Sequence, residues 1–380
     1  MNHIKKYNNT RATLAIAVAS FRSIIRSPSA VVFSLAFPLI FIVVFANIGG
    51  SGMSVDVGVD KKCDTTNPIY KILEKTSVVH LIKNQSEKEM TSNLSKGHID
   101  VILLITNNGG KGWTIYPPLS ALPVKPAFTV NVQYTSASAQ KGNVFKTLIT
   151  SVLFQLNTIG NEAPSHEAVL KETTIHGREY KYIDFILPGM LGFSLLSSGV
   201  FGTAFVFLSL RLTLVIKRFF ATPVKKYSIV LGEALARLIF SWLGALFIIA
   251  VGHLFFGFTL IHGFVTVINM LVLAAIGLII FMGFGFIISG IAKNESTIPP
   301  LSNIITMPQF LLSGTFFATT AFPSWLQSLS NILPLTYLNK AMRSVAFEGA
   351  GLGDVGPQLM VLGIWFIIVY AVAVRTFKWE

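Results

Sequence analysis

Residues 313–343 read SGTFFATTAFPSWLQSLSNILPLTYLNKAMR, and this segment carries two prolines, Pro323 and Pro334, between two long apolar stretches of the chain. Backbone that is interrupted at membrane depth is tolerated only where it is buried in protein or lines a cavity. We therefore expect residues 316–337 to form a short re-entrant hairpin that dips into the outer leaflet of a membrane.

The composition indicates a membrane protein before any motif is considered. Of the 380 residues, 52% are hydrophobic and 12% are charged, whereas an average soluble domain carries about 25% charged residues. Runs of apolar residues long enough to cross a bilayer predict six transmembrane helices. They are Ala30 to Ile48, Ile183 to Leu210, Ile229 to Val251, Val265 to Ile291, Ile298 to Phe317 and Gln358 to Val374. Pro308 is expected to kink the fifth.

The basic residues predict the orientation of these helices. With the amino terminus inside, the cytoplasmic segments hold 13 Lys and Arg residues, whereas the short outer loops hold only Lys340 and Arg343. This distribution follows the positive-inside rule. Both termini, including the tail 376–380, are therefore expected in the cytoplasm. The formal charge of +13 reflects this topology and not a nucleic-acid-binding stripe.

The residues ahead of the first span predict a second kind of membrane contact. Within residues 1–28, apolar side chains from Leu14 to Ile25 recur at helical spacing, opposite Arg11, Arg22 and Arg26. We expect a cytoplasmic amphipathic helix in the membrane interface, with an ordinary basic flank as the alternative. The first span, residues 29–48, is too long for the apolar core of a signal peptide, so we expect an uncleaved anchor.

A polar insert, residues 49–182, separates the first span from the other five, which lie within residues 183–375. Predicted strands alternate with predicted helices along it, which is typical of a small α/β domain. The expected strands are Val55 to Val59, Val78 to Ile82, Ile99 to Ile105 and Phe128 to Tyr134; the expected helices are Ile69 to Lys75, Ser86 to Lys96 and Ser136 to Leu156. Topology places this domain outside the cell. Its single cysteine, Cys63, excludes an intramolecular disulfide.

The sequence carries no recognisable catalytic or cofactor motif. The segment nearest to a P-loop, Gly109 to Gly112, lacks the required spacing and hydroxyl residue. The seven histidines are scattered and form no zinc motif. We therefore expect neither an enzyme nor a bound metal or cofactor.

Two charged segments remain as candidate functional residues. Glu233 and Arg237 lie four residues apart at the start of the third span, which favours an intrahelical ion pair with an Arg that snorkels to the surface. Residues 211–227 read RLTLVIKRFFATPVKKY and predict a short cytoplasmic helix parallel to the membrane. A simple basic turn would explain its charges but not Phe219 and Phe220.

The order of these motifs resembles the ABC-2 type permeases, the membrane subunits of bacterial ABC exporters. The resemblance is carried by Thr222, Pro223, Gly232 and Glu233, and by the tail residues Leu312, Ser313, Gly314, Phe322, Pro323, Trp325, Leu333, Pro334, Leu335, Thr336, Tyr337 and Arg343. It touches nearly the whole chain, and the large domain between the first two spans is similar to one branch of these exporters. The fold it implies is an α-helical polytopic membrane protein with six transmembrane helices, an outer re-entrant hairpin and a small α/β extracytoplasmic domain.

The resemblance also implies a function. The chain would be the permease subunit of an ATP-driven exporter in the bacterial inner membrane, moving a hydrophobic or amphipathic cargo such as a lipid or drug out of the cytoplasm or inner leaflet. Two separate ATP-binding cassette subunits would bind ATP-Mg and hydrolyse it, and a second permease copy or paralogue would complete the pore. Cargo identity, the choice between homodimer and heterodimer, and a periplasmic partner of the outer domain stay open.

Three groups of residues receive roles from the resemblance. The coupling helix within 211–227 would contact the ATPase through Lys217, Arg218, Phe219, Phe220, Thr222 and Pro223; Glu233 and Arg237 would stabilise the elbow; and Ser313, Gly314, Phe322, Pro323, Trp325, Pro334 and Tyr337 would form the outer gate. The alternative is a membrane-anchored sensor or scaffold whose outer domain binds a ligand.

Overall fold

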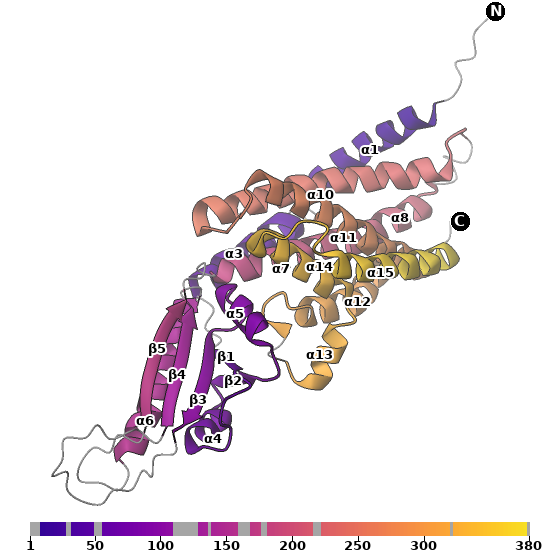
Figure 1. The fold of residues 1–380 in the computed structure, drawn as a ribbon. Coiled ribbons are helices and arrows are strands. Elements are labelled where there is room, and N and C mark those ends of the chain that lie inside the picture. The colour runs from indigo at the N-terminus through magenta and orange to yellow at the C-terminus, as the bar shows by residue number, and fades with distance from the viewer. Residues whose placement is uncertain are drawn as a thin grey trace, which may run out of the picture. The chain divides into compact units, whose positions relative to one another are not determined.

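The computed structural model describes residues 8–27, 32–48, 55–108, 128–135, 138–158, 168–175, 181–215, 222–319 and 322–377. The chain divides into two compact units (Figure 1). One, the helical unit, contains Met1–Gly49 and Lys181–Glu380; the other, the insert domain, contains Gly50–Tyr180. Each unit has its own buried core.

The insert domain is built on one five-stranded sheet with the order β2-β1-β3-β4-β5. Its strands are β1 (Val55–Val59), β2 (Val79–Ile82), β3 (Val101–Asn107), β4 (Phe128–Thr135) and β5 (Ala168–Ile175). β1 lies parallel to β2 and β3, β4 runs antiparallel to β3, and β5 runs parallel to β4. The helices are α4 (Pro68–Lys75), α5 (Glu87–Ser95) and α6 (Ala139–Thr158).

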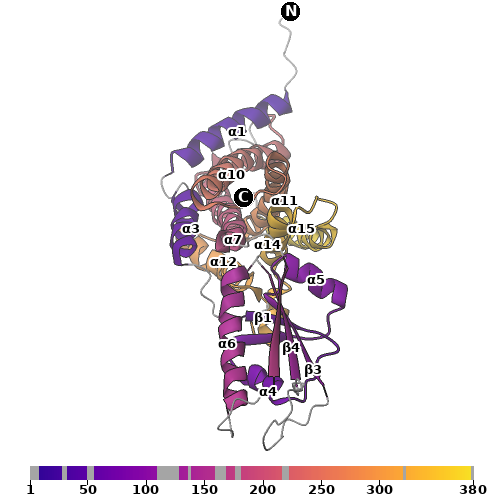
Figure 2. The ribbon, with the colours of Figure 1, turned by 60° about the vertical axis from the view of Figure 1, so that its left-hand side comes forward.

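Helices cover both faces of this sheet. On one face, Leu73 of α4 and Phe145 of α6 are fully buried with Val57 of β1. On the other face, Met90 and Leu94 of α5 join a smaller cluster with β3. Figure 2 shows α6 and α5 on opposite sides of the strands. The result is a three-layer α/β/α arrangement.

The alternating pattern in the insert predicted seven of these elements, and the structure has a helix or strand of the expected type at each. The strand β5 was not predicted. Its sequence, AVLKETTI, lacks an alternating apolar face, and residues 171–174 are exposed. An edge strand is bonded on one side only and is often polar, so its pairing with β4 leaves little trace in the sequence.

The helical unit contains four helices that are long and apolar enough to cross a membrane, counted over the described residues. They are the continuous helix Tyr182–Leu212, α10 (Lys226–Phe256), α11 (Phe264–Ile291) and α15 (Gly356–Thr376). The first comprises α7 (Tyr182–Ser197), a π-helical turn (Ser198–Gly202) and α8 (Thr203–Leu212). The structure is therefore that of a mostly helical polytopic membrane protein.

Two of the six predicted spans coincide with shorter helices. Residues Ser34–Phe45 form an apolar helix across a π-helical turn (Val32–Ala36) and α3 (Phe37–Ile48). The fifth predicted span is α12 (Ile298–Leu312), of 15 residues, or about 22 Å at 1.5 Å per residue. It stops early because Gly314, with φ of +74°, turns the backbone out of the helix.

The helix α11 lies at the centre of the helical unit and packs against α7, α8, α10, α14 and α15. Gly285 permits its close approach to the π-helical turn, because a Cβ at that position would lie 2.6 Å from Thr203 Cβ and 2.8 Å from the Gly199 carbonyl oxygen. Phenylalanine fills the space around the shorter helices. Phe41 and Phe310 both contact Phe316, with ring centroids 5.5 and 4.8 Å apart.

The expected hairpin region contains two short helices, α13 (Ser324–Ser330) and α14 (Pro334–Arg343). Both prolines that interrupt the sequence stand at helix starts, Pro323 as the residue before α13 and Pro334 as the first residue of α14, where a missing N–H costs nothing. The helix α14 is mostly buried against α7, α11 and α15. A π-helical turn (Ser344–Glu348) continues it.

The α1 helix (Asn9–Ile25) packs against α10, as Figures 1 and 2 both show. Gly232 marks their closest approach, since a Cβ there would lie 2.7 Å from Ile16 Cγ2. The helix was predicted, but its apolar stripe is divided. Ala17 and Ile24 are buried, whereas Leu14 is exposed.

Phe145→Ala is expected to destabilise the insert domain by about 3–5 kcal/mol, because it empties a fully buried position between α6 and the sheet. The measurement is urea unfolding of a fragment carrying residues 50–180. Val144→Ala is the control, since Val144 is 41% exposed and should change stability by less than about 0.5 kcal/mol. Equal effects of the two variants would contradict the assigned core.

Candidate functional site

Glu233 and Arg237 form a buried ion pair on α10. Arg237 Nη2 lies 2.7 Å from Glu233 Oε1, and the two side chains are 5% and 3% exposed. The spacing of four residues places both on one face of the helix. The expected ion pair is present, but the expectation that Arg237 snorkels to the surface is wrong, because its side chain is buried inside the helical unit.

The guanidinium binds the backbone of the neighbouring helix. Arg237 Nη1 donates to the Ser198 carbonyl oxygen at 3.2 Å, and Nη2 donates to the Gly202 carbonyl oxygen at 2.5 Å. These are the first and last residues of the π-helical turn between α7 and α8. A π-helical turn displaces carbonyls from the regular hydrogen-bond ladder, and Arg237 supplies donors there. Any side chain at Gly202 would collide with Nη1.

A second arginine joins the tail segment to the start of α7. Arg343 Nη2 donates to the Gly314 carbonyl oxygen at 2.6 Å, and Nε donates to the Phe185 carbonyl oxygen at 3.0 Å. The guanidinium carbon also lies 3.6 Å from the centre of the Phe185 ring, a cation–π contact. Tyr182 supports the same junction, because its hydroxyl donates to the Phe316 carbonyl oxygen at 2.7 Å.

Buried polar side chains surround this junction, and of these the sequence had singled out only Ser313. Asn339 Nδ2 lies 3.2 Å from Thr315 Oγ1, which in turn is 3.0 Å from Ser313 Oγ. Ser330 Oγ donates to the Leu312 carbonyl oxygen at 2.6 Å, tying α13 to the end of α12. Asn339 stands in the middle of α14, in a segment that was expected to be a short outer loop, so no apolar run marked it as a core residue.

Asp184 is a further buried group that was missed. It is 0% exposed, Oδ1 accepts from the Thr259 amide at 2.7 Å, and Oδ2 accepts from the Lys181 amide at 3.1 Å. The carboxylate thereby caps the amino end of α7 and holds the connection between α10 and α11. An acidic residue at the second position of the predicted span was the available signal.

The other residues predicted for the outer gate differ in their burial beside the junction that Arg343 makes between the tail segment and α7. Pro323 and Trp325 are exposed and Phe322 is half-buried, whereas Pro334 is buried in α14. The hydroxyl of Tyr337 donates to the Asn331 carbonyl oxygen at 2.7 Å. The structure therefore brings Ser313 and Gly314 together with Arg343, but leaves Trp325 apart from them.

The predicted coupling segment is described only in part. Thr222 and Pro223 are exposed residues just ahead of α10. Lys217, Arg218, Phe219 and Phe220 lie outside the described residues. On the preceding side, Arg211 at the end of α8 donates to the Ala292 carbonyl oxygen at 2.5 Å, which fastens α8 to the end of α11.

The insert domain has its own charged cluster. Asp56 Oδ1 lies 3.1 Å from His80 Nδ1, the Asp56 amide donates to Asp100 Oδ2 at 2.9 Å, and Lys141 Nζ lies 3.1 Å from the same Asp100 oxygen. Burial raises the pKa of the Asp56 carboxyl; the positive charge of Lys141 opposes this shift, and the neighbouring Asp100 carboxylate adds to it. The cluster joins β1, β2 and α6.

Comparison with known proteins identifies relatives along the whole chain. The model of ABC-2 family transporter proteins matches residues 28–375. ABC transporter G family member 20 of Dictyostelium discoideum is 26% identical over 384 residues, covering 95% of this chain and 50% of that protein, so the chain spans half the length of this relative. The linearmycin resistance permease protein LnrN of Bacillus subtilis is 21% identical over 393 residues, covering 96% and 99%. The inner membrane transport permease YadH of Escherichia coli is 26% identical over 209 residues, covering 54% and 76%.

Arg237→Leu is expected to destabilise the helical unit by about 3–5 kcal/mol, because it leaves the Glu233 carboxylate buried without its partner. Thermal stability of the detergent-solubilised chain, followed by gel filtration after heating, measures the loss. The double variant Glu233→Gln/Arg237→Leu removes the buried charge and should recover part of it. A single variant as stable as the unmodified chain would show that the pair is dispensable.

Asp56→Asn tests the charged cluster through pH. The pKa of the Asp56 carboxyl is raised in the folded domain, so the folded domain binds this proton more tightly than the unfolded chain does. The stabilisation from the protonated carboxyl is fully present below the ordinary pKa of 3.8 and is lost as the pH rises through the pKa of the folded domain. The unmodified domain should therefore gain stability relative to the variant as the pH falls from 7 toward 4. Urea unfolding across this range is the measurement, and a constant difference would contradict the assignment.

Proposed function

The chain belongs to the ABC-2 family of transporter proteins, and from this premise we propose that it is the membrane-spanning permease subunit of an ATP-driven exporter. The family supplies the membrane part of an ABC transporter, which works with ATP-binding subunits. In this proposal the chain performs no covalent chemistry. It moves a cargo while partner subunits bind and hydrolyse ATP.

The proposed topology has six spans with both termini in the cytoplasm. The helix Ser34–Phe45 and α12 would be the first and fifth spans, completed by residues at their ends. The excess of Lys and Arg on the expected cytoplasmic segments supports this orientation. The relative named as an inner membrane permease in Escherichia coli supports a bacterial inner membrane as the location.

The observation that carries the proposal is the pair of hydrogen bonds by which Arg237 of α10 binds the π-helical turn. Residues 211–227 connect α8 to α10, and Arg237 bonds α10 to the π-helical turn that leads into α8, through Ser198 and Gly202. A force applied to residues 211–227 would therefore move α8 and α10 together rather than bend the connection between them. This is the mechanical property that a coupling segment requires.

In the proposed mechanism, closure of two ATP-binding subunits pushes Lys217, Arg218, Phe219, Phe220, Thr222 and Pro223. The pair Glu233–Arg237 keeps α10 rigid at this elbow and passes the displacement to α7 and α11. Two permease copies, identical or paralogous, would surround the transport path. The insert domain would lie on the outer side of the membrane.

The outer gate would be formed by residues 316–337 as a re-entrant hairpin. Arg343 and Asn339 hold the entry of this segment against α7, whereas Trp325 is 70% exposed. A gate needs a fastened base and a part that can move, and the exposed Trp325 between the two fastened ends of this segment supports that role. Ser313 and Gly314 would act as its fixed base.

The cargo is proposed to be hydrophobic or amphipathic, such as a lipid or a drug. One relative is named a linearmycin resistance permease and another a probable multidrug permease, and these names support export of such molecules. The few charged residues within the spans support the same cargo class, because an ion would require charged or carbonyl-lined sites along its path.

Purification of the tagged chain in mild detergent, with mass spectrometry and an ATPase assay on the co-purified proteins, tests this function. We expect a stoichiometric ATP-binding subunit. Phe219→Ala/Phe220→Ala should lower its cargo-stimulated ATPase activity by about tenfold or more, since the loss of about 1.4 kcal/mol at an interface hot spot corresponds to tenfold.

Leu254→Ala/Phe255→Ala is the matched control, because these residues are exposed at the opposite end of α10 and should leave the ATPase activity unchanged. Full stimulation in the Phe219/Phe220 variant would contradict the coupling role. A chain that purifies without any ATPase would contradict the permease function and favour a membrane-anchored sensor.

A further inference from the structure

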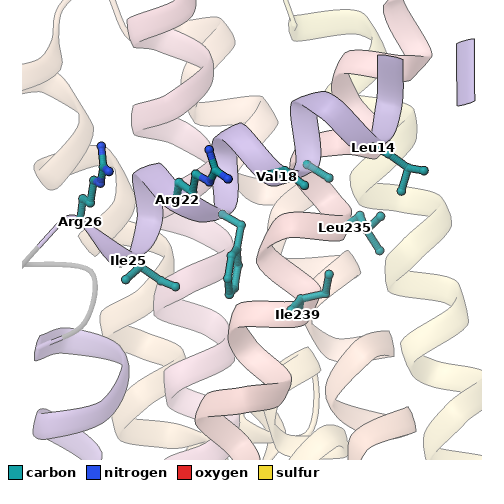
Figure 3. Close-up of a pocket in the computed structure, with 9 residues that line it drawn as sticks. Leu14, Val18, Arg22, Ile25, Arg26, Leu235 and Ile239 are labelled. Atoms are coloured by element: carbon teal, nitrogen blue, oxygen red, sulfur yellow. The ribbon is translucent and has the colours of Figure 1, made fainter. Parts of the chain in front are cut away.

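A groove runs along the junction of α1 and α10. It has a volume of about 400 Å³, within the range of roughly 300–1,000 Å³ typical of small-molecule sites. Figure 3 shows Leu14, Val18 and Ile25 of α1 and Leu235 and Ile239 of α10 along it. Because Ala17 and Ile24 pack on α10 while Leu14, Val18 and Ile25 are exposed, the groove is a continuous apolar surface open on one side.

Arg22 and Arg26 form one edge of this groove. They also line an adjoining, more polar hollow of about 550 Å³ together with Ala19, Ser23 and Ser27. In Figure 3 the guanidinium groups of Arg22 and Arg26 lie on one side of α1 and the side chain of Ile25 on the other. Two basic groups thus stand where an apolar hollow meets a polar one.

These two cations lack protein partners. Within the described part of the chain, neither guanidinium makes an ion pair or a side-chain hydrogen bond, and no acidic residue lines either hollow. Arg237 and Arg343, by contrast, each bind two backbone carbonyl oxygens. Exposed basic residues at a membrane interface attract anionic lipid head groups, and these two guanidinium groups are free to pair with one.

We propose that this groove binds an anionic phospholipid of the bilayer, with its phosphate between Arg22 and Arg26 and one acyl chain against Val18, Leu235 and Ile239. Guanidinium groups bind phosphate through paired hydrogen bonds. The apolar surface beside the two guanidinium groups would contact the acyl chain. The site thus has a basic end next to an apolar groove, as a phospholipid has a charged head group next to its acyl chains. The binding requires only that the chain be embedded in a membrane and is independent of any ATPase partner.

A second copy of this chain is a poorer occupant. In a symmetric contact the same patch meets itself, so Arg22 and Arg26 of one copy would approach the same residues of the other. With no acidic residue at the groove edge, these like charges would oppose the contact. A phospholipid supplies the missing negative charge.

The bound lipid would hold α1 on α10. The two helices share the small buried cluster of Ile24, Ala236 and Phe240, and an acyl chain in the groove would extend this contact along the exposed side. The fraction of anionic lipid in the membrane would then determine how stably α1 packs on α10, the helix that follows the coupling segment 211–227.

The experiment uses the full chain in vesicles of phosphatidylcholine, with spin-labelled phosphatidylglycerol or spin-labelled phosphatidylcholine as the probe. We expect the motionally restricted fraction to be larger for phosphatidylglycerol. Arg22→Gln/Arg26→Gln should abolish this preference, with a loss of about fivefold for each Arg from the ~1 kcal/mol that a basic residue contributes near anionic lipid.

Arg11→Gln is the matched control, since Arg11 is exposed on the same helix but lines neither hollow. An equal loss of the phosphatidylglycerol preference in this variant would mean that general surface charge causes the preference, and it would contradict the proposed site. Val18→Trp, which fills the groove and keeps both Arg residues, should also lower the preference; an unchanged preference would overturn the placement of the acyl chain.

Val18→Cys in a Cys63→Ser background tests the other occupant, a second copy of the chain. Oxidation in the vesicles should yield no disulfide-linked dimer if lipid fills the groove. Efficient cross-linking between two copies would overturn the proposal and assign the groove to a protein interface. Melting temperatures of all variants in the absence of phosphatidylglycerol should match that of the unmodified chain, because none of the changed side chains is buried except half-buried Cys63.

Discussion

The burial of the Arg237 guanidinium is the constraint on which the helical unit depends. A charged group inside a membrane costs about 2.5–3.5 kcal/mol even on the most favourable insertion scales, so it must be paired. Glu233 neutralises it, and the carbonyl oxygens of Ser198 and Gly202 accept its hydrogen bonds. These carbonyls belong to a π-helical turn, where the regular hydrogen-bond ladder is interrupted. The guanidinium of α10 therefore supplies hydrogen-bond donors to these carbonyl oxygens, and they supply acceptors to the buried guanidinium.

This interaction also dictates what surrounds it. Gly202 must lack a side chain, since a Cβ would collide with the guanidinium, and Gly285 of α11 must lack one because the helix containing the π-helical turn lies directly against it. Arg237, Gly202 and Gly285 therefore fix the contacts among α10, α11 and the helix that contains the π-helical turn. At the other end of α7, Arg343 binds the Phe185 carbonyl, 13 residues or about 20 Å from Ser198. The helix Tyr182–Leu212 is therefore fastened near its start by Arg343 and at its middle by Arg237.

Much of this architecture could be predicted from the sequence, and the failures have physical reasons. Hydropathy marks the four long helices because a span must be apolar throughout. Short apolar runs that alternate with helical segments mark the strands β1 to β4, because these strands carry buried side chains. Spacing predicts that Glu233 and Arg237 meet, but not where the guanidinium points, since that depends on a neighbouring helix. The π-helical turn and strand β5 have no such local pattern. Neither does Asn339, whose partners Ser313 and Thr315 lie more than 20 residues away in the chain.

Both fastening arginines bind backbone oxygens, and this explains why arginine is needed. A carbonyl is present whatever side chain occupies Ser198, Phe185 or Gly314, so the attachment does not depend on the side chains there. It depends on a donor group that reaches two oxygens at once. The planar guanidinium has five N–H donors in a fixed fork, whereas a lysine ammonium is a compact point charge. Lysine at position 237 could pair with Glu233 but could not also bridge the first and last carbonyls of the π-helical turn. The geometry of the turn therefore selects arginine.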